Sequence, residues 1–362
     1  MAYTTINKST DYFNTLLYTG DGTSPKARTG VGFQPDLVWS KTRGEARNHQ
    51  LIDSVRGADK TLQSNVTDAE GNQFSYGYLQ SFDSDGFTSI AGSSAPDNWN
   101  GNGTTYVAWN WKAGGGQGSS NTDGSINTTY TSVNTTAGFS ISSYTGTGSN
   151  ATIGHGLSSA PEIIFQKCRS NSSTWWHVGS TKISTGFNSY LHLNETDAVA
   201  SDSSVWNNTN PTSSVFSVGS AAGTNGSSRT NIAYCFHSVK GYSKIGSYTG
   251  SGSTNGSYIH LGFKPAWTMY KRISSGGSGG WSIHDNKRSE SNGNNPLRKY
   301  IVAQTSGTES TDDFFTIDHL SNGFKLRATD GESNASGVTY LYMAFAESPF
   351  VTGASGIPTT AR

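Results

Sequence analysis

The chain has 362 residues, a length that predicts two or three units, each able to bury a core of its own. Only 14% of its residues are charged, and 25 basic side chains balance 25 acidic ones, so we expect no field that would bind nucleic acid. No run approaches the ~20 apolar residues of a membrane helix, and the 12% aromatic content argues against disorder.

The N-terminal segment begins MAYTTINKSTDYF and contains no apolar signal core. We therefore expect a protein that is made in the cytoplasm without a signal peptide and does not insert into a membrane. Residues 1–11 are predicted to form an N-terminal arm ahead of the first strand.

From there to the C-terminus, short runs rich in β-branched and aromatic residues alternate with Gly, Asn and Ser, while helical periodicity is nearly absent. The runs include LVWSK, TYVAWNW, EIIFQK, NIAYCF and TYLYMAF. Several are apolar at consecutive positions, as expected for strands covered on both faces. The predicted class is all-β.

One phrase, Tyr-Thr-Gly-x-Gly, occurs three times and begins at Tyr18, Tyr144 and Tyr248. In each case a proline follows the tyrosine after 17 residues, and a lysine stands six residues past the proline. The prolines and lysines are Pro35, Pro161 and Pro265, and Lys41, Lys167 and Lys271. A register kept three times indicates a repeated unit.

The length of the repeat predicts three tandem, diverged antiparallel β-sandwich domains of the jelly-roll or lectin-like kind. Their expected ranges are 12–112, 138–240 and 242–350. A tract rich in Gly, Ser, Asn and Thr at 113–137 has the composition of a flexible linker, and 351–362 is expected to be a C-terminal tail.

Several phrases, in this order, carry a resemblance to a known family: GVGFQPDLVWSKTR, NTTAGFSISSYTGTGSNATIGHGL, AYCFHSVKGYSKIGSYTGSGS, GFKPAW and TYLYMAFAESPF. They resemble uncharacterised virion structural proteins, fibre-like or tail-associated, from tailed phages of marine bacteria and cyanobacteria. The resemblance implies a virion location on the particle exterior, as a tail fibre, tail appendage or capsid-surface protein. It also implies other virion proteins as partners. Low charge with abundant Tyr, Trp and Ser suits extensive contact surfaces between subunits, so we expect a homo-oligomer, and the resemblance favours a trimer.

Residues that could carry chemistry do not form a recognisable constellation. Asp83 and Asp85 begin a calcium-loop pattern that lacks its closing Glu, so we expect a hairpin turn there. His49, His177 and His284 give no ligand set, and the phrase SIHD lacks a nucleophile motif. We expect no catalytic residue, cofactor or metal, and a polysaccharide depolymerase is the third of three candidate functions.

Five tryptophans in polar, turn-rich surroundings are candidates for surface contact: Trp99, Trp175, Trp176, Trp206 and Trp281. Their rings are suited to stack on sugars, which gives the alternative of a lectin-like carbohydrate-binding or receptor-binding adhesin that contacts host surface glycans. Tryptophan also fills sandwich cores and subunit contacts, and this alternative stays open.

The three repeated lysines each close an apolar strand, where a charge would discourage edge pairing, and a functional role is the alternative. The two cysteines, Cys168 and Cys235, are too few for a disulfide framework and are expected to be small buried residues.

Overall fold

The computed structural model of the chain describes residues 4–95, 97–274, 279–289 and 295–349. Nearly all of its regular structure is antiparallel β-sheet, and the prediction of an all-β sandwich fold is confirmed. The helical elements are short: η1 (Ser9–Asp11), η2 (Phe74–Tyr76), η3 (Gly186–Asn188), α1 (Ser203–Trp206) and α2 (Ala222–Asn225).

The first unit packs a four-stranded sheet, in the order β1-β7-β3-β4, against a three-stranded sheet, β2-β6-β5. Its strands are β1 (Phe13–Thr19), β2 (Lys26–Thr29), β3 (Leu37–Thr42), β4 (Gln50–Asp53), β5 (Tyr78–Asp83), β6 (Gly86–Ile90) and β7 (Thr105–Trp111). Val38 and Ile52 from one sheet meet Leu79 and Phe87 from the other in an outer core.

The second unit has a six-stranded sheet, β13-β12-β11-β15-β9-β8, and a two-stranded sheet, β10-β14. Its strands are β8 (Tyr130–Asn134), β9 (Phe139–Thr145), β10 (Ala151–Gly154), β11 (Ile163–Cys168), β12 (Trp176–Ser180), β13 (Leu191–His192), β14 (Val215–Val218) and β15 (Thr230–Phe236). Residues 113–137, predicted as a linker, instead supply β8, and Ile126 bridges to Ile153 and joins the outer core of this unit. Composition alone does not reveal that such a tract pairs with the strand that follows it.

The third unit repeats the plan with a six-stranded sheet, β16-β24-β18-β19-β20-β21, and a three-stranded sheet, β17-β23-β22. Its strands are β16 (Ser243–Thr249), β17 (Tyr258–His260), β18 (Phe263–Arg272), β19 (Trp281–Asp285), β20 (Lys299–Val302), β21 (Ser310–Thr311), β22 (Ile317–Leu320), β23 (Gly323–Leu326) and β24 (Thr339–Pro349). The predicted tail, 351–362, lies outside the described residues.

The same four strands stand in the same order in all three units: β1-β7-β3-β4, β9-β15-β11-β12 and β16-β24-β18-β19. Tyr18, Tyr144 and Tyr248 are each the second-last residue of the first strand in this set. That the units are diverged tandem copies stays a prediction, and this common register supports it.

The Tyr-Thr-Gly-x-Gly phrase has a structural explanation in its two glycines. A Cβ on the first glycine would lie 2.2 Å from the Gly101 carbonyl oxygen at Gly20, 2.5 Å from that of Gly226 at Gly146, and 2.2 Å from that of Ala335 at Gly250. The second glycine has a positive φ of 70° at Gly22, 78° at Gly148 and 67° at Gly252, a region that favours glycine. Backbone close approach therefore selects the phrase at each occurrence.

A buried asparagine forms hydrogen bonds with each of these loops. In the second unit, Thr147 N donates to Asn225 Oδ1 at 2.9 Å, and Asn225 Nδ2 donates to the carbonyl oxygens of Ser149 at 2.6 Å and Gly219 at 2.8 Å. Asn100 and Asn334 make the corresponding contacts with Asp21 N at 3.0 Å and Ser251 N at 2.9 Å.

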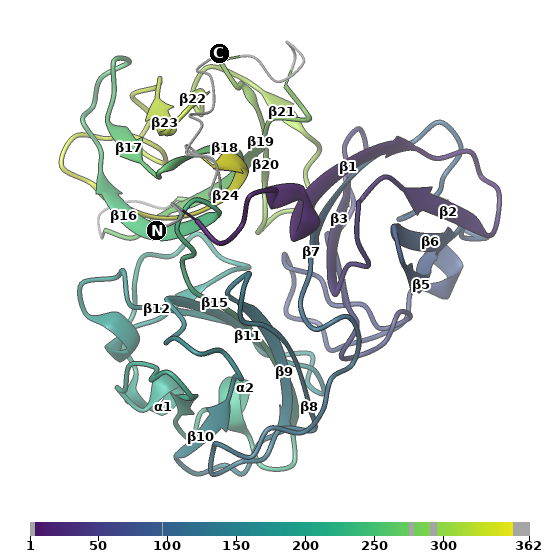
Figure 1. Cartoon of the computed structure of the whole chain (residues 1–362), viewed down its shortest axis with the longest axis vertical. Helices are drawn as coiled ribbons and strands as arrows, with labels where there is room; N and C mark the ends of the chain where they lie inside the picture. The colour runs from purple at the N-terminus through teal and green to yellow at the C-terminus, as the bar shows by residue number, and fades with distance from the viewer. Residues whose placement is uncertain (1–3, 96, 275–278, 290–294, 350–362) are drawn as a thin grey trace.

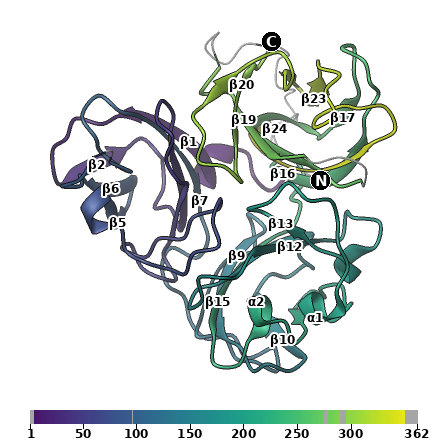
Figure 2. The same ribbon diagram turned by 180° about the vertical axis from the view of Figure 1, so that it is seen from behind.

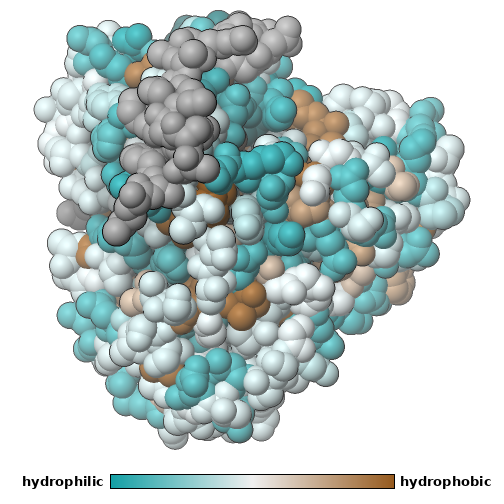
Figure 3. All heavy atoms as spheres, in the orientation of Figure 1, coloured by the Kyte–Doolittle hydropathy of each residue, from teal (hydrophilic) through white to brown (hydrophobic). Residues whose placement is uncertain are grey.

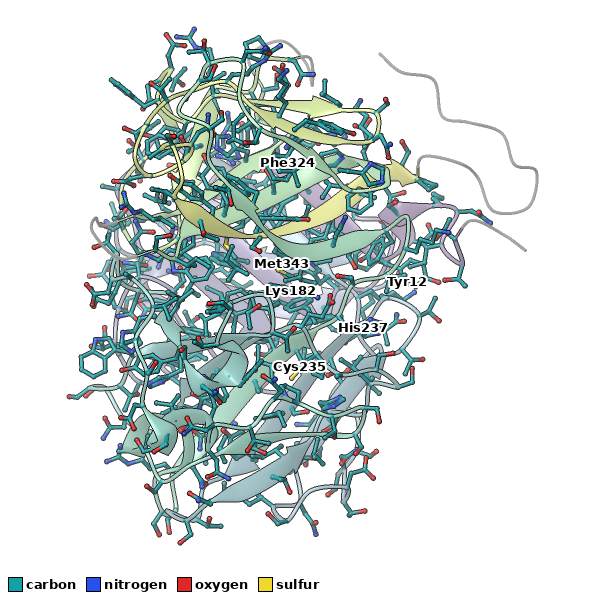
Figure 4. All side chains as sticks on the ribbon, turned by 90° about the vertical axis from the view of Figure 1, so that its left-hand side faces the viewer. Tyr12, Lys182, Cys235, His237, Phe324 and Met343 are labelled. Carbon is teal, nitrogen blue, oxygen red and sulfur yellow. The ribbon has the colours of Figure 1, made fainter. Side chains whose placement is uncertain are left out.

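The three units are arranged around a common centre, with the larger sheet of each facing inward and the smaller sheet outward (Figures 1 and 2). Strand β7 is covered on both faces. Val107, Trp109 and Trp111 enter the shared central core, while Ala108 faces the outer core. In Figure 4, Met343 lies between the second and third units, whereas Phe324 and Cys235 lie inside their outer cores.

The middle of this central core is lined by apolar side chains. It leaves a cavity of about 20 Å³ lined by residues of all three units, among them Trp39, Phe165 and Trp267. A cavity of this size holds at most one water, and its apolar lining offers that water no partners. Even Ile6, in the segment predicted as an N-terminal arm, is buried in this core.

The repeated lysines lie inside the molecule, and the prediction that they protect a sheet edge is wrong. Lys41, Lys167 and Lys271 are each 0% exposed. Each stands in a strand that is paired on both sides, as β3 is with β4 and β7, so there is no edge at that place to protect.

The lysine ammonium groups bind backbone carbonyls, and two of them reach the preceding unit. Lys167 Nζ donates to the carbonyl oxygens of Cys168 at 3.1 Å, Thr174 at 2.8 Å and, in the first unit, Thr67 at 3.0 Å. Lys271 Nζ likewise donates to Thr196 O of the second unit at 2.7 Å. Lys41 Nζ donates to Thr42 O and Glu45 O, within its own unit.

Two residues beyond each lysine, a backbone carbonyl accepts a hydrogen bond from the neighbouring unit. The donors are Glu309 N to Arg43 O at 2.8 Å, Glu70 N to Arg169 O at 2.7 Å and Val199 N to Ile273 O at 3.4 Å. Paired guanidinium–carboxylate contacts add to two junctions, Arg43 with Glu309 and Arg169 with Glu70. The third unit is thereby joined to the first, and the three units form a closed ring.

We expect the stability of the protein to rise with pH in the alkaline range. Burial lowers the pKa of Lys41, Lys167 and Lys271 to about 8, whereas an unfolded lysine titrates near 10.4. Between these values the three unfolded lysines bind more protons than the folded ones, so these groups make the free energy of unfolding increase with pH, and their contribution is lost as pH falls through about 8.

Urea unfolding measured from about pH 7.5 to about pH 9 tests this expectation, because the unfolded tyrosines, whose pKa values burial raises in the folded protein, ionise increasingly above that range and reverse the slope. Lys167→Met removes one of the three titrating groups and should show a shallower pH slope than the wild-type chain. A free energy of unfolding that falls steadily over this interval in the wild-type chain would contradict the expectation.

Candidate binding pocket beside Trp175

Two of the five candidate tryptophans lie in outer cores, so their prediction as surface contacts is wrong. Trp99 and Trp206 are 0% exposed. Trp99 packs edge-on against Phe87 with ring centroids 5.8 Å apart, and Trp206 packs against Phe187 at 5.3 Å. The short helix α1 ends at Trp206 and places its indole against the outer core.

Trp176 and Trp281 are also buried, and their prediction as surface contacts is wrong for a different reason. Each begins the strand that pairs with a lysine-bearing strand, opposite the lysine, and faces the preceding unit. Trp176 Nε1 donates to Gln63 O at 2.9 Å, and Trp281 Nε1 donates to His192 O at 2.8 Å. They make contacts between units, as the packing alternative allowed.

Trp175 is the exception, with 47% of its surface exposed. It stands beside a pocket of about 230 Å³ on the second unit. The pocket lies between the loop that leads into β12, strand β13 and the helices α1 and α2. Its lining includes Thr174, Trp175, His177, Tyr190, His192 and Asp202.

Strand alternation explains how this pocket acquires its aromatic wall. In β12, Trp176 turns to the central core, so the next side chain, His177, faces the other side of the sheet. His177 is paired with His192 across β12 and β13, and their ring centroids are 5.2 Å apart. Tyr190 completes the group at 5.7 Å from His177 and 5.1 Å from His192.

The exposed indole is itself supported from beneath. Trp175 stacks on the His192 imidazole with centroids 5.0 Å apart and an interplanar angle of 20°. Gly223 bounds the opposite side, where a Cβ would lie 2.5 Å from His177 Cε1. The stack fixes one indole face and leaves the other available.

Both imidazoles are neutral at physiological pH. Burial lowers the pKa of His177 to about 3 and that of His192 to about 4. At the rim, hydrogen bonds from Ser204 lower the pKa of Asp202, whose carboxylate accepts from Ser204 N at 2.8 Å. Two buried ring nitrogens, His177 Nδ1 and His192 Nε2, have no hydrogen-bond partner among the described residues.

Tyr190 and His192 were not singled out from the sequence, although a signal was present. In SYLHL, Leu191 and Leu193 enter the central core, so Tyr190 and His192 share the opposite face. The period-two pattern spans too few residues to stand out, and the strand itself has only two.

Two other motifs have structural explanations. The Asp-Gly hairpin is confirmed: Asp83 pairs with Gly86 across a two-residue turn, and Asp85 accepts hydrogen bonds from Gly30 N at 3.1 Å and Gly32 N at 2.6 Å. In SIHD, Asp285 binds Arg288 and accepts from Trp109 Nε1 at 3.0 Å, while His284 Nε2 lies 3.3 Å from the Tyr270 hydroxyl.

Within the described ranges, no group of three or more His, Cys, Asp or Glu side chains is placed to hold a metal ion. The same part of the chain contains no helix long and apolar enough to cross a membrane. Cys168 and Cys235 are free and buried, as predicted.

Fold and pocket together define an all-β protein of three β-sandwich units that share one central core. The chain belongs to the family described as Domain of unknown function (DUF7483), whose model matches residues 8–349. No curated protein matches it.

Proposed function

We propose that the protein is a non-enzymatic structural component on the exterior of a tailed-phage virion, as a tail fibre, tail appendage or capsid-surface protein. The resemblance of its strand and loop phrases to virion structural proteins motivates this proposal. The observation that supports it is the closed ring, in which backbone hydrogen bonds at all three junctions join the units into one body. Such a body can carry exposed loops without deforming.

The surface is compatible with this role. In the face shown in Figure 3, hydrophobic residues are scattered between polar ones and do not gather in one broad patch. The exposed large apolar side chains likewise come from different units, as Phe74, Trp175 and Phe314 do. Homo-oligomerisation, with a trimer favoured, stays a prediction, as does contact with other virion proteins.

The proposal predicts that the chain is present in purified phage particles. Quantitative mass spectrometry of gradient-purified particles should detect it at constant stoichiometry, and antibodies against it should label intact particles in electron micrographs. A low copy number would indicate the tail, and a high one the capsid surface. Presence in infected cells together with absence from purified particles would overturn the proposal, and turnover of a host polysaccharide by the purified chain would overturn its non-enzymatic part.

A further inference from the structure

We propose that the pocket beside Trp175 is a binding site for one neutral saccharide unit. This inference deepens the proposed function by naming what the exterior surface recognises, but binding by the isolated chain does not depend on membership of a virion. Three features of the pocket support it: the exposed indole, the unpartnered histidine nitrogens and the charge of the rim.

The first step is the aromatic platform. Stacking on His192 holds the Trp175 indole in place while 47% of its surface stays exposed. A sugar ring presents a face of C–H groups that packs on such an indole, and a ring held in advance loses little side-chain entropy on binding. A stacking site requires an exposed indole, and Trp175 provides one in a protein whose other tryptophans are mostly buried.

The second step is hydrogen bonding in the floor of the pocket. His177 is only 5% exposed, and its Nδ1 has no partner among the described residues, nor has His192 Nε2. A buried polar atom without a partner is costly, so a ligand that supplies one gains affinity. A hydroxyl group both donates and accepts, and therefore pairs with these nitrogens in either tautomer of a neutral imidazole.

Size and charge then restrict the ligand. A volume of about 230 Å³ lies below the range of about 300–1,000 Å³ typical of drug-sized ligands, so one sugar unit suits it better than a longer chain. The lining contains the Asp202 carboxylate and no Lys or Arg, which disfavours acidic sugars and phosphate. A quaternary ammonium would satisfy the charge but leave the imidazole nitrogens unpartnered.

The first unit provides an internal comparison. A pocket of about 330 Å³ in the corresponding place is lined mainly by polar side chains, among them Arg47, Asn48 and Gln63, and by the Tyr76 ring, over which the Arg47 guanidinium lies. Trp176 lies opposite Lys167, and the register that pairs Ser40 with Gln50, continued by one residue, sets His49 against Lys41, so Asn48 corresponds to Trp175. Without a stacking indole there, we assign the site to the second unit alone.

Calorimetric titration of the full chain with a panel of neutral monosaccharides, namely glucose, galactose, mannose and N-acetylglucosamine, tests the site, with choline chloride and N-acetylneuraminic acid as charged probes. We expect at least one neutral sugar to bind, and Trp175→Ala to weaken it by about tenfold or more. His192→Phe keeps a ring beneath the indole but removes both nitrogens, and should weaken binding as well. Phe314→Ala, which removes a 64% exposed side chain of the third unit, is the matched control and should bind as wild type.

Thermal midpoints of all variants by circular dichroism show whether each is folded. The inference is overturned if no neutral sugar binds the folded wild-type chain, if folded Trp175→Ala binds equally well, or if choline binds at this site in preference to every sugar. Sugar binding by a chain that is absent from phage particles would sink the proposed function and leave this inference standing.

Discussion

Replacing Trp281 with alanine should lower the free energy of unfolding by about 3–5 kcal/mol, the usual cost of truncating a buried tryptophan. The indole is 1% exposed and packs near Phe165 of the second unit, with ring centroids 6.0 Å apart. Its loss would also leave the His192 carbonyl without the hydrogen bond that it receives at 2.8 Å. Urea unfolding followed by circular dichroism measures the change.

Trp175→Ala is the control for this substitution, because it removes the same side chain from an exposed position. Its effect should stay within about 0.5 kcal/mol. Equal destabilisation by the two substitutions would contradict the assignment of Trp281 to the junction between the second and third units. A single unfolding transition is expected in the wild-type chain, since the three units share one core.

Lys167→Met should destabilise the protein by about 2 kcal/mol. The ammonium group donates to the carbonyl oxygens of Thr67, Cys168 and Thr174, of which the contacts with Cys168 and Thr174 are buried, and each buried acceptor left unpaired costs about 1–3 kcal/mol. Methionine fills similar space but donates nothing. Relief of the buried charge offsets part of this loss, so the measured value falls below the simple sum.

Lys60→Met is the matched control, because the Lys60 side chain is 39% exposed and makes an ion pair with Asp59 at 3.4 Å. An exposed pair of this kind contributes about 0–1 kcal/mol. If Lys167→Met were as mild as Lys60→Met, the lysine would not be holding the junction between the first and second units. Chemical denaturation of both variants at pH 7 makes the comparison.

The ring also changes how the aromatic content of the sequence is interpreted. Low charge and abundant Tyr and Trp led to the expectation of extensive contacts between subunits. In the structure, Trp176, Trp281 and their neighbours make contacts between units of one chain. One copy therefore contains three junctions between units, each with a backbone hydrogen bond two residues beyond a repeated lysine, whatever its oligomeric state.

Local chemistry was sufficient to predict the class and several details of this protein. The β-branched runs gave the strands, consecutive apolar residues in TYVAWNW indicated a strand buried on both faces, and Asp-Gly at residues 85–86 indicated a hairpin turn. The Tyr-Thr-Gly-x-Gly register was visible as a repeat in the sequence, although the backbone that requires its first glycine comes from far along the chain. The strands and the hairpin turn depend on neighbours close in sequence, so the sequence by itself determined them.

Burial and partnership depended on contacts from far along the chain, and only the tertiary structure decided them. Trp175 and Trp176 are adjacent and chemically identical, yet strand alternation places one at the surface and the other against Gln63 of the first unit. Lys167 ends an apolar strand like any edge lysine, but its carbonyl partner Thr67 comes from 100 residues earlier. The chemistry of each side chain determines whether it must be buried or hydrogen-bonded. The packing of three sheets around one core determines which residue becomes its partner.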